Sequence, residues 1–286
     1  MTYDVTYKVY LCLYHFFLFT CVCVISVGKC HWNLRSSCKG KEGYTSLAYE
    51  ATVDHNKRVH HLAGHHYGAK NDKTIVMTDS HVQAIRDGEL YQDLEYEMFV
   101  NEDGTMETFV GGYLIADGGY HRWRCLQCPL KHSEDPDVNL FCAALESIRK
   151  DVECFFGILK IRFRYIDGKI EVHSFEEIDN VMYVCCILHN MLLEHDGFSD
   201  RWRDLDEWAD PDADAHEVFD GQEHLDIIEA RGVARAGGQL TVGMLRAVAD
   251  IDEYDVEHDP TWGNLHNALV KNYRIAKQRN ALQWLK

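Results

Sequence analysis

The chain has 286 residues, enough for one large or two small domains, and 46% of them are hydrophobic, which suffices for a core. Its formal net charge of −17 argues against a protein coated in basic surface for unspecific nucleic-acid binding. The charge is unevenly spread, so DNA stays open as a partner. Cysteine occurs 11 times, with Cys185 beside Cys186 in a predicted helix, which favours buried thiols in a reducing compartment over disulfides.

The amino-terminal segment 1–27 is of uncertain origin, because residues 10–27 are almost wholly apolar. Their length suits a signal peptide or a marginal membrane span, which would make the protein membrane-anchored or secreted. Asp4 beside Lys8 and the lack of a small-residue cleavage site disfavour that interpretation. The alternative is a buried β-strand over residues 21–27, preceded by sequence that does not belong to the fold.

Two β-hairpins and a short helix are predicted next. The helix covers residues 74–86 and ends at Asp87-Gly88. The hairpins pair residues 45–53 with 58–63 around the turn 54–57, and residues 97–100 with 105–110 around the turn 101–104. Basic and polar residues precede them: Lys29, His31, Arg35, Lys39 and Lys41. Hairpins followed by helices indicate an α/β or α+β domain.

The central stretch sets two acidic residues in different kinds of structure. A short buried strand over residues 113–116 stops at Asp117, where glycines follow. Glu153 lies one residue off a helical stripe of apolar side chains, at the border of the buried face. The stripe consists of Phe141, Leu145, Ile148, Val152, Phe155, Leu159 and Phe163. Carboxylates from a strand end and a helix could converge on a divalent ion, which prefers oxygen ligands.

A second helix is predicted to begin at Ser174, which forms a capping box with Glu177, and to end near Glu194. We expect one of its faces to carry Ile178, Met182, Cys185, Leu188 and Leu192. Residues 197–260 are expected to be a solvated, partly disordered acidic linker. Residues 261–286 are expected to form a basic helix, which contains Lys271, Arg274, Lys277 and Arg279.

Three motifs in order resemble the Harbinger-type DDE transposases, specifically their plant-transposon-protein branch. Tyr113-Leu-Ile-Ala-Asp117-Gly-Gly-Tyr120-His-Arg-Trp123 is similar to the family's second-aspartate motif. Arg149-Lys-Asp-Val-Glu153-Cys-Phe-Phe-Gly157 is similar to its glutamate helix, and Cys185-Cys-Ile-Leu-His189-Asn190-Met191 to its closing motif. The 35 residues between Asp117 and Glu153 suit the spacing of the family. The resemblance covers roughly residues 28–196.

The resemblance implies an RNase H-like fold, with helices packed around a mixed sheet. It implies DNA cleavage and strand transfer at transposon ends, with two Mg²⁺ or Mn²⁺ ions as cofactors. Asp117 and Glu153 carry over as catalytic metal ligands. Asp72 joins them, because Gly68-Ala-Lys-Asn-Asp72 matches the family's Gly-Ser-x-x-Asp motif with Ala69 in place of serine. The implied setting is the nucleus, with a homo-oligomer or a separate DNA-binding protein supplied in trans as further partners.

One departure from the family concerns the first strand. Relatives end that strand in an aspartate three residues before a His-Trp pair, which here is His31-Trp32, so the aspartate's position falls on Gly28. Loss of that carboxylate is expected to weaken and misplace a metal ion, at a cost of orders of magnitude in rate. Asp54 is the nearest other candidate. Relatives also carry an amino-terminal DNA-binding region, which this chain has no room for.

Other constellations carry both a functional and a structural interpretation. Cys125 and Cys128, with His132 nearby, have zinc-knuckle spacing, but free thiols are the alternative. The histidines at 60, 61, 65 and 66 are expected to alternate between faces, which disfavours a single metal site. A basic flank of the glutamate helix either contacts DNA phosphates or is a solvated face; it comprises Arg149, Lys160, Arg162 and Arg164. His189-Asn190 is expected to be a hydrogen-bonded core pair.

Two main classes of function follow. The first is a metal-dependent nuclease or transposase with Asp72, Asp117 and Glu153 at its centre, impaired at Gly28. The second is an inactive transposase remnant that binds DNA or protein. A membrane-anchored protein is the third and rests only on residues 10–27.

Overall fold

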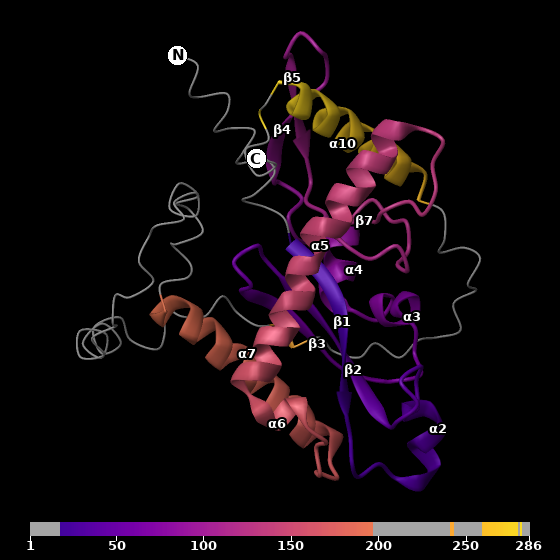
Figure 1. The fold of residues 1–286 in the computed structure, drawn as a ribbon, viewed down its shortest axis with the longest axis vertical. Helices are drawn as coiled ribbons and strands as arrows, with labels where there is room; N and C mark the ends of the chain where they lie inside the picture. Colours follow the sequence, from indigo (N-terminus) through magenta and orange to yellow (C-terminus); the bar gives the residue numbers. More distant parts are fainter. Residues whose placement is uncertain (1–17, 197–240, 243–258, 280, 282–286) are drawn as a thin grey trace, which may run out of the picture.

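A computed structural model describes residues 18–196, 241–242, 259–279 and 281 (Figure 1). Its main sheet has the strand order β7-β6-β1-β2-β3-β8. These strands are β1 (Leu18–Ser26), β2 (Ser46–Val53), β3 (Val59–Tyr67), β6 (Leu114–Ile115), β7 (Leu126–Gln127) and β8 (Thr241–Val242). Strands β1, β2 and β3 are antiparallel neighbours, whereas β6, β7 and β8 each pair in parallel. The predicted mixed sheet with packed helices is confirmed.

Both predicted hairpins are present. Asp54 closes the turn between β2 and β3, because its carboxylate accepts a hydrogen bond from the Arg58 amide at 3.0 Å. Lys57 adopts the left-handed conformation there, with φ 66°. Strand β2 lies inside the sheet and all its residues are buried. The second hairpin forms a separate two-stranded sheet of β4 (Glu95–Phe99) and β5 (Met106–Val110).

The apolar amino-terminal segment contributes strand β1, as one of the two interpretations of the sequence predicts. It pairs with β2 from Phe19 to Ser26 and with β6 at Leu18 and Phe19. Residues 1–17 lie outside the described part of the chain. Within the described ranges, no helix is long and apolar enough to cross a membrane.

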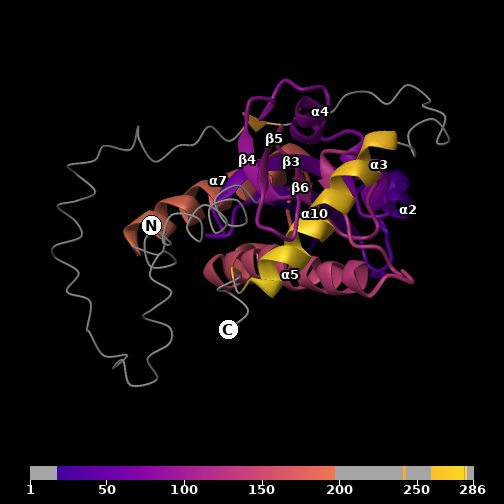
Figure 2. The same ribbon diagram turned by 90° about the horizontal axis from the view of Figure 1, so that it is seen from above.

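Side chains of β1 alternate between two layers of helices, as the pleat of a strand requires. Phe19, Cys23 and Ile25 join the larger core, which also contains buried residues of α5, α7 and α10. Leu18 and Val22 pack on the second core, which lies against α3 and α4. Figure 2 shows α5 and α7 on one side of the sheet and α4 on the other.

Helix α5 (Pro136–Arg162) spans the sheet and carries the predicted apolar stripe. Its first turn is capped by Asp135, which accepts a hydrogen bond from the Asp137 amide at 2.8 Å, and Pro136 supplies a preformed first residue. Val152, Phe155 and Leu159 are fully buried. The predicted apolar stripe is therefore buried. Its burial sets the orientation of α5 and with it the direction in which Glu153 faces.

Helix α7 (Phe175–His195) begins at Ser174 as predicted, since the Ser174 hydroxyl accepts from the Glu177 amide at 3.4 Å. The predicted buried face is wrong in its second half, because Leu188 and Leu192 are 40% and 37% exposed. His189 and Asn190 are buried there instead. Asn190 bonds both the amide and the carbonyl of Val59 at 2.9 Å, so the edge of β3 dictates which residues face inward.

The predicted helix 74–86 is two helices, α3 (Asp72–Val76) and α4 (Ser80–Arg86). Asp79 interrupts it, because its buried carboxylate caps α4 by accepting from the amides of His81 and Val82 at 2.7 and 3.1 Å. The short elements η1 (Trp32–Leu34), α2 (Arg35–Cys38) and α6 (Arg164–Asp167) complete the part up to residue 196. The predicted acidic linker, residues 197–260, lies almost wholly outside the described residues.

The predicted carboxyl-terminal helix is α10 (Pro260–Gln278), and it belongs to the core. It packs on α5 and on strand β4. Its buried apolar side chains are Trp262, Leu265, Leu269, Val270, Tyr273, Ile275 and Ala276. The Trp262 indole donates to the Leu126 carbonyl at 2.9 Å, and the Asn272 side chain accepts from the Phe99 amide at 2.9 Å. The helix therefore holds the β4–β5 sheet against the rest of the domain.

Candidate active site

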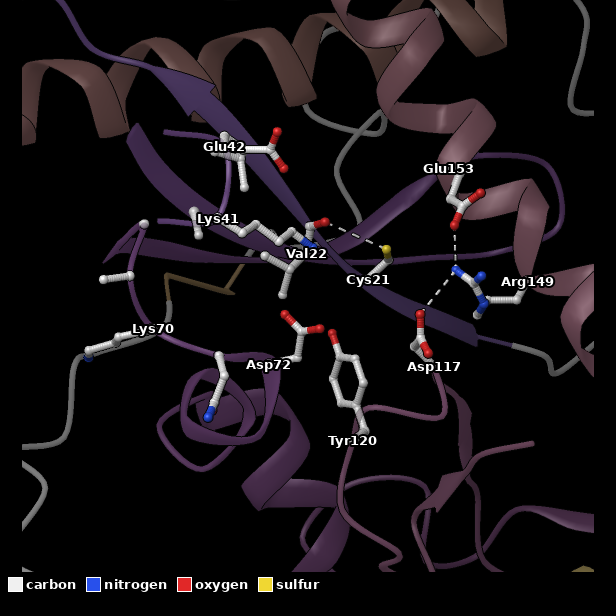
Figure 3. Close-up of a pocket in the computed structure, with 15 residues that line it drawn as sticks. Cys21, Val22, Lys41, Glu42, Lys70, Asp72, Asp117, Tyr120, Arg149 and Glu153 are labelled. Atoms are coloured by element: carbon white, nitrogen blue, oxygen red, sulfur yellow. Dashed lines mark hydrogen bonds and ion pairs between the residues drawn. The ribbon is translucent and has the colours of Figure 1, made fainter. Parts of the chain in front are cut away.

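A cavity of about 380 Å³ opens where two neighbouring strands part. Strand β6 ends at Ile115, whereas β1 continues to Ser26, so this edge of β1 has no strand neighbour from Thr20 to Ser26 in the described part. The chain that leaves β6 passes through Asp117 and lines the space. Helices α3 and α5 supply further walls, through Asp72 and through Arg149 and Glu153 (Figure 3).

The three predicted catalytic carboxylates all line this cavity. Asp72 is the first residue of α3, whose amino terminus is capped by Asn71 through a 2.8 Å hydrogen bond from the Thr74 amide. Asp117 lies two residues beyond β6, and Glu153 lies in the middle of α5. Figure 3 shows Glu153 on the helix that faces the two aspartates. Three residues distant in sequence thus meet at one site.

Arg149 lies between two of these carboxylates. Its Nη1 atom is 2.5 Å from Glu153 Oε1 and 3.8 Å from Asp117 Oδ2. Burial opposes the charged guanidinium, but the Glu153 hydrogen bond and the Asp117 charge outweigh it, so the pKa of Arg149 is raised. The side chain of Arg149 is 15% exposed, against 49% and 52% for Asp117 and Glu153. A cation of the protein itself therefore occupies the gap between the two acids.

The third carboxylate, Asp72, lies in a different electrostatic environment. Burial raises its pKa, and the negative charge of Asp117 adds to this, while the ammonium group of Lys41 acts in the opposite direction. Lys41 extends into the cavity toward Asp72, and the Tyr120 ring lies beside it (Figure 3). A positive charge close to Asp72 therefore favours the ionised form of its carboxyl group.

The donor set suits a hard divalent cation, because carboxylate oxygens are the ligands that Mg²⁺ and Mn²⁺ take. In the present side-chain arrangement, however, no three His, Cys, Asp or Glu side chains of the described ranges are grouped closely enough to hold one ion. Arg149 supplies positive charge between Asp117 and Glu153 instead. Metal binding therefore requires Arg149 to move away and the carboxylates to turn toward each other.

The structure corrects the position of the first-strand residue. Gly28 does not line the cavity; its amide bonds to the Ile170 carbonyl at 2.8 Å, and a Cβ there would meet the Glu171 carboxylate at 2.3 Å. The parallel register pairs Phe19 of β1 with Ile115, the last residue of β6, and Cys21 and Asp117 each follow two residues later in the chain. Both line the cavity, and Figure 3 shows them at the end of the cavity where the guanidinium of Arg149 lies. The residue of β1 beside Asp117 is therefore Cys21.

Cys21 gives the site one negative charge fewer than an aspartate at the same position would. Burial raises the pKa of its thiol to about 12; Arg149 lowers it, and Glu153, Cys23 and Asp72 raise it further. At neutral pH the thiol is protonated and supplies no anionic ligand. The β1 residues that line the cavity are Cys21, Val22 and Val24, and none of them carries a carboxylate.

Sequence reasoning missed a buried acidic pair, one member of which contacts Tyr120 of the cavity lining. Glu50 of β2 is completely buried, and so is Asp79. Burial raises the pKa of Glu50 far above its usual range, and the neighbouring Asp79 raises it further, while a 2.9 Å hydrogen bond from the Thr20 hydroxyl opposes this. Asp79 keeps its charge, since His61 and the amides of α4 lower its pKa against the effect of burial. Glu50 is therefore the protonated member of the pair.

Three of the four side chains in the predicted basic flank of α5 make contacts within the protein. Arg149 is bound to the site carboxylates, and Arg162 pairs with Asp196 at 2.9 Å. The ammonium group of Lys160 donates to the Val24 carbonyl at 3.3 Å. Arg164 is exposed on α6. Arg149, Lys160 and Arg162 thus serve separate local contacts, and contact with DNA stays a prediction for this group.

The remaining candidate metal sites have structural roles. Cys125 and Cys128 are buried in the second core as free thiols. The histidines at 60, 61 and 65 each pair with a different aspartate, Asp54, Asp79 and Asp179, so they alternate as predicted. His189 bonds the Lys57 carbonyl at 2.9 Å, which with Asn190 confirms the hydrogen-bonded core pair. Asp54 is used by its turn and does not line the cavity.

The structure is a mixed α/β domain in which one cavity is lined by four acidic side chains, among them Asp72, Asp117 and Glu153, and by Arg149. The family described as plant transposon protein matches residues 20–200. The chain belongs to the plant transposon protein family. No solved structure matches it.

Two groups of relatives are similar over shorter stretches. Proteins named "Putative nuclease HARBI1" from Homo sapiens and Bos taurus are 27% identical over 122 residues, which cover 40% of this chain and 33% of theirs. The Xenopus laevis protein of the same name is 31% identical over 87 residues, 30% of this chain and 25% of that one. The chain thus aligns with a quarter to a third of the length of these relatives.

Proposed function

We propose that this chain is an RNase H-like, transposase-derived domain that cleaves and joins DNA with divalent metal ions, and that Cys21 impairs it. The observation that carries the proposal is the meeting of Asp72, Asp117 and Glu153 at one cavity. The strand order β3-β2-β1-β6-β7, with three antiparallel strands followed by two parallel ones, supports the RNase H-like part. Membership of a transposon protein family and similarity to a named nuclease support the activity.

Asp72, Asp117 and Glu153 would hold the Mg²⁺ or Mn²⁺ ions. The chemistry that the ions supply when bound is activation of the attacking water or hydroxyl and stabilisation of the leaving oxygen. The protein's own residues prepare the site: α5 fixes Glu153 opposite the end of β6, and Lys41 favours the ionised form of Asp72. Arg149, once released from the two acids, is placed to meet a phosphate that enters the cavity.

The partners of the domain follow from this activity. DNA at transposon ends is the proposed substrate, and a separate protein in trans would supply specific DNA binding. The proposed location is the nucleus, where such DNA lies.

A second candidate function is that of an inactive descendant that binds DNA without cutting it. Two observations favour it: Cys21 offers a protonated thiol where a carboxylate is needed, and Arg149 neutralises Asp117 and Glu153 without a metal. Both candidates share the fold and the DNA partner. They differ in whether the cavity supports metal-dependent chemistry.

Incubation of the purified chain with supercoiled plasmid and Mn²⁺ or Mg²⁺ separates the two candidates. The enzyme should convert the plasmid to its nicked form, and Asp117→Asn should abolish the conversion. A folded preparation that binds DNA but shows no metal-dependent nicking would establish the second candidate and refute the first.

A further inference from the structure

A basic and aromatic segment borders the cavity, and among its basic and aromatic residues the proposed metal chemistry uses Lys41 alone. Residues 29–44, called the basic ledge here, comprise η1, α2 and the loop that leads into β2. They carry four lysine or arginine side chains and one acidic one, Glu42, in a chain whose net charge is −17. The basic residues are Lys29, Arg35, Lys39 and Lys41, and all four are exposed. Figure 1 shows α2 in the lower part of the molecule, and the Ser46 hydroxyl at the beginning of β2 donates to its Cys38 carbonyl at 3.2 Å.

The cations of the basic ledge are available for a ligand. No carboxylate in the described part of the chain lies within ion-pair distance of Lys29, Arg35 or Lys39. Arg149 and Arg162, by contrast, are already paired with carboxylates. Unpaired, solvated cations are the groups that bind phosphates, since no internal partner has to be displaced.

The basic ledge is joined to the cavity by a close backbone contact. A Cβ at Gly40 would lie 2.0 Å from the Gly68 carbonyl oxygen, so the two loops approach as only glycine permits. The Ala69 amide bonds the Ser37 carbonyl at 3.0 Å across the same contact. Lys41 and Lys70 follow directly on either side, and both line the cavity. The carboxyl-terminal part of the ledge is therefore held at the mouth of the cavity.

Lys41 and Lys70 point in different directions from this mouth. Lys41 extends inward toward Asp72, whereas Lys70 extends away from it (Figure 3). Glu42 lines the same cavity and is the one acidic side chain among the ledge residues. A phosphate chain that leaves the cavity on this side would pass Lys41 and Lys70 first and Lys39 next.

Two exposed aromatic residues belong to the same segment as these cations. Trp32 is 78% exposed and Tyr44 is 46% exposed, so both rings are accessible to solvent. Exposed aromatic rings beside a basic track are the arrangement that binds single strands, because bases stack on the rings while the cations neutralise phosphates. A duplex offers phosphates but few free base faces, so the two features together favour a strand with unpaired bases.

We propose that the basic ledge binds the single-stranded part of the DNA that leaves the cavity, with phosphates on Lys39, Lys41 and Lys70 and an unpaired base stacked on Trp32. The orientation of the strand rests on the proposed function, because the cavity end is where the reacting phosphate would lie. Binding itself does not require metal or catalysis. The ledge thus also suits the inactive, DNA-binding candidate.

The test is fluorescence anisotropy of the full chain with a labelled 20-nucleotide single strand, its duplex and an RNA strand of equal sequence, in EDTA. Trp32→Ala should weaken single-strand binding about tenfold, the loss of one stacked base, and change duplex binding less than twofold. Trp32→Phe should restore most of the loss. Lys39→Gln with Lys41→Gln should weaken both ligands and lower the salt dependence by about 0.7 per lost phosphate contact on the single strand.

The matched control is Lys271→Gln with Lys277→Gln, which removes the same charge from exposed positions of α10. Glu42→Gln should strengthen binding. The proposal is overturned if the ledge variants bind like the control, if Trp32→Ala affects duplex and single strand equally, or if RNA binds far more tightly than DNA. Ledge-dependent binding without plasmid nicking refutes the proposed function alone, and nicking without ledge dependence refutes the ledge alone.

Discussion

Replacement of Arg149 by glutamine should make the cavity a better divalent-metal site. The guanidinium lies 2.5 Å from Glu153 and 3.8 Å from Asp117, so a metal ion has to displace it before it can reach both carboxylates. A pair of unit charges 4 Å apart interacts by about 1 kcal/mol in water and about 4 kcal/mol at an effective dielectric constant of 20. Both carboxylates are half exposed, so the lower end applies to each.

The competition therefore amounts to about 1–2 kcal/mol, which is about a 5- to 30-fold gain in Mn²⁺ affinity for Arg149→Gln. Titration calorimetry or electron paramagnetic resonance of free Mn²⁺ measures this directly, without DNA and without turnover. Lys150→Gln is the control, because Lys150 is the exposed neighbour on α5 and does not line the cavity. Equal Mn²⁺ affinity in both variants, or weaker binding in Arg149→Gln, would refute the idea that Arg149 occupies the place of a metal ion.

Three further predictions concern the strands around the cavity. Cys21→Asp places a carboxylate beside Asp117 in place of a thiol with a pKa of about 12, so Mn²⁺ affinity should rise at least tenfold; unchanged calorimetry would show that the position does not face the metal. Glu50 has a raised pKa when folded, so the unfolding free energy should fall as pH rises from its unfolded value, near 4.3, through its folded one. Glu50→Gln should remove that dependence, and its melting temperature relative to wild type should increase with pH; a constant difference between pH 5 and 8 would argue against a protonated Glu50. Asn190→Ala leaves the amide and carbonyl of Val59 without partners, which should cost about 2–4 kcal/mol in chemical denaturation; a cost below 1 kcal/mol would show that these bonds contribute little.

Elements that depend on residues close together in the sequence were predicted correctly. The turn at Asp54, the cap at Ser174 and the apolar stripe of α5 each depend on residues a few positions apart, and the structure confirms all three. The break at Asp79 was not predicted, because a capping aspartate in a helical pattern looks like any other polar residue. Its burial depends on Glu50 and His61, which lie on other elements.

The same division applies to the candidate site. Asp72, Asp117 and Glu153 were found through family motifs. The order of these motifs indicates a fold that brings residues distant in sequence together. Cys21 was not found, since its place beside Asp117 follows from the register between β1 and β6, and the spacing to a His-Trp pair pointed to Gly28. The position of the basic ledge depends on the contact between Gly40 and Gly68, which are 28 residues apart in sequence. No local sequence pattern predicts this contact.

The helix α10 shows a third limit. The sequence predicts a basic helix there, but it does not indicate what the helix packs against. In the structure its apolar face closes the core against α5 and β4. Truncation before residue 260 is therefore a poor way to isolate the domain.

Plasmid nicking by the full chain tests the central claim most directly. We predict slow conversion of supercoiled plasmid that requires Mn²⁺ or Mg²⁺, accelerates in Cys21→Asp and disappears in Asp117→Asn. Nicking that survives Asp117→Asn, or a folded Cys21→Asp variant that binds Mn²⁺ and DNA but never cuts, would contradict the assignment of this cavity as a nuclease site.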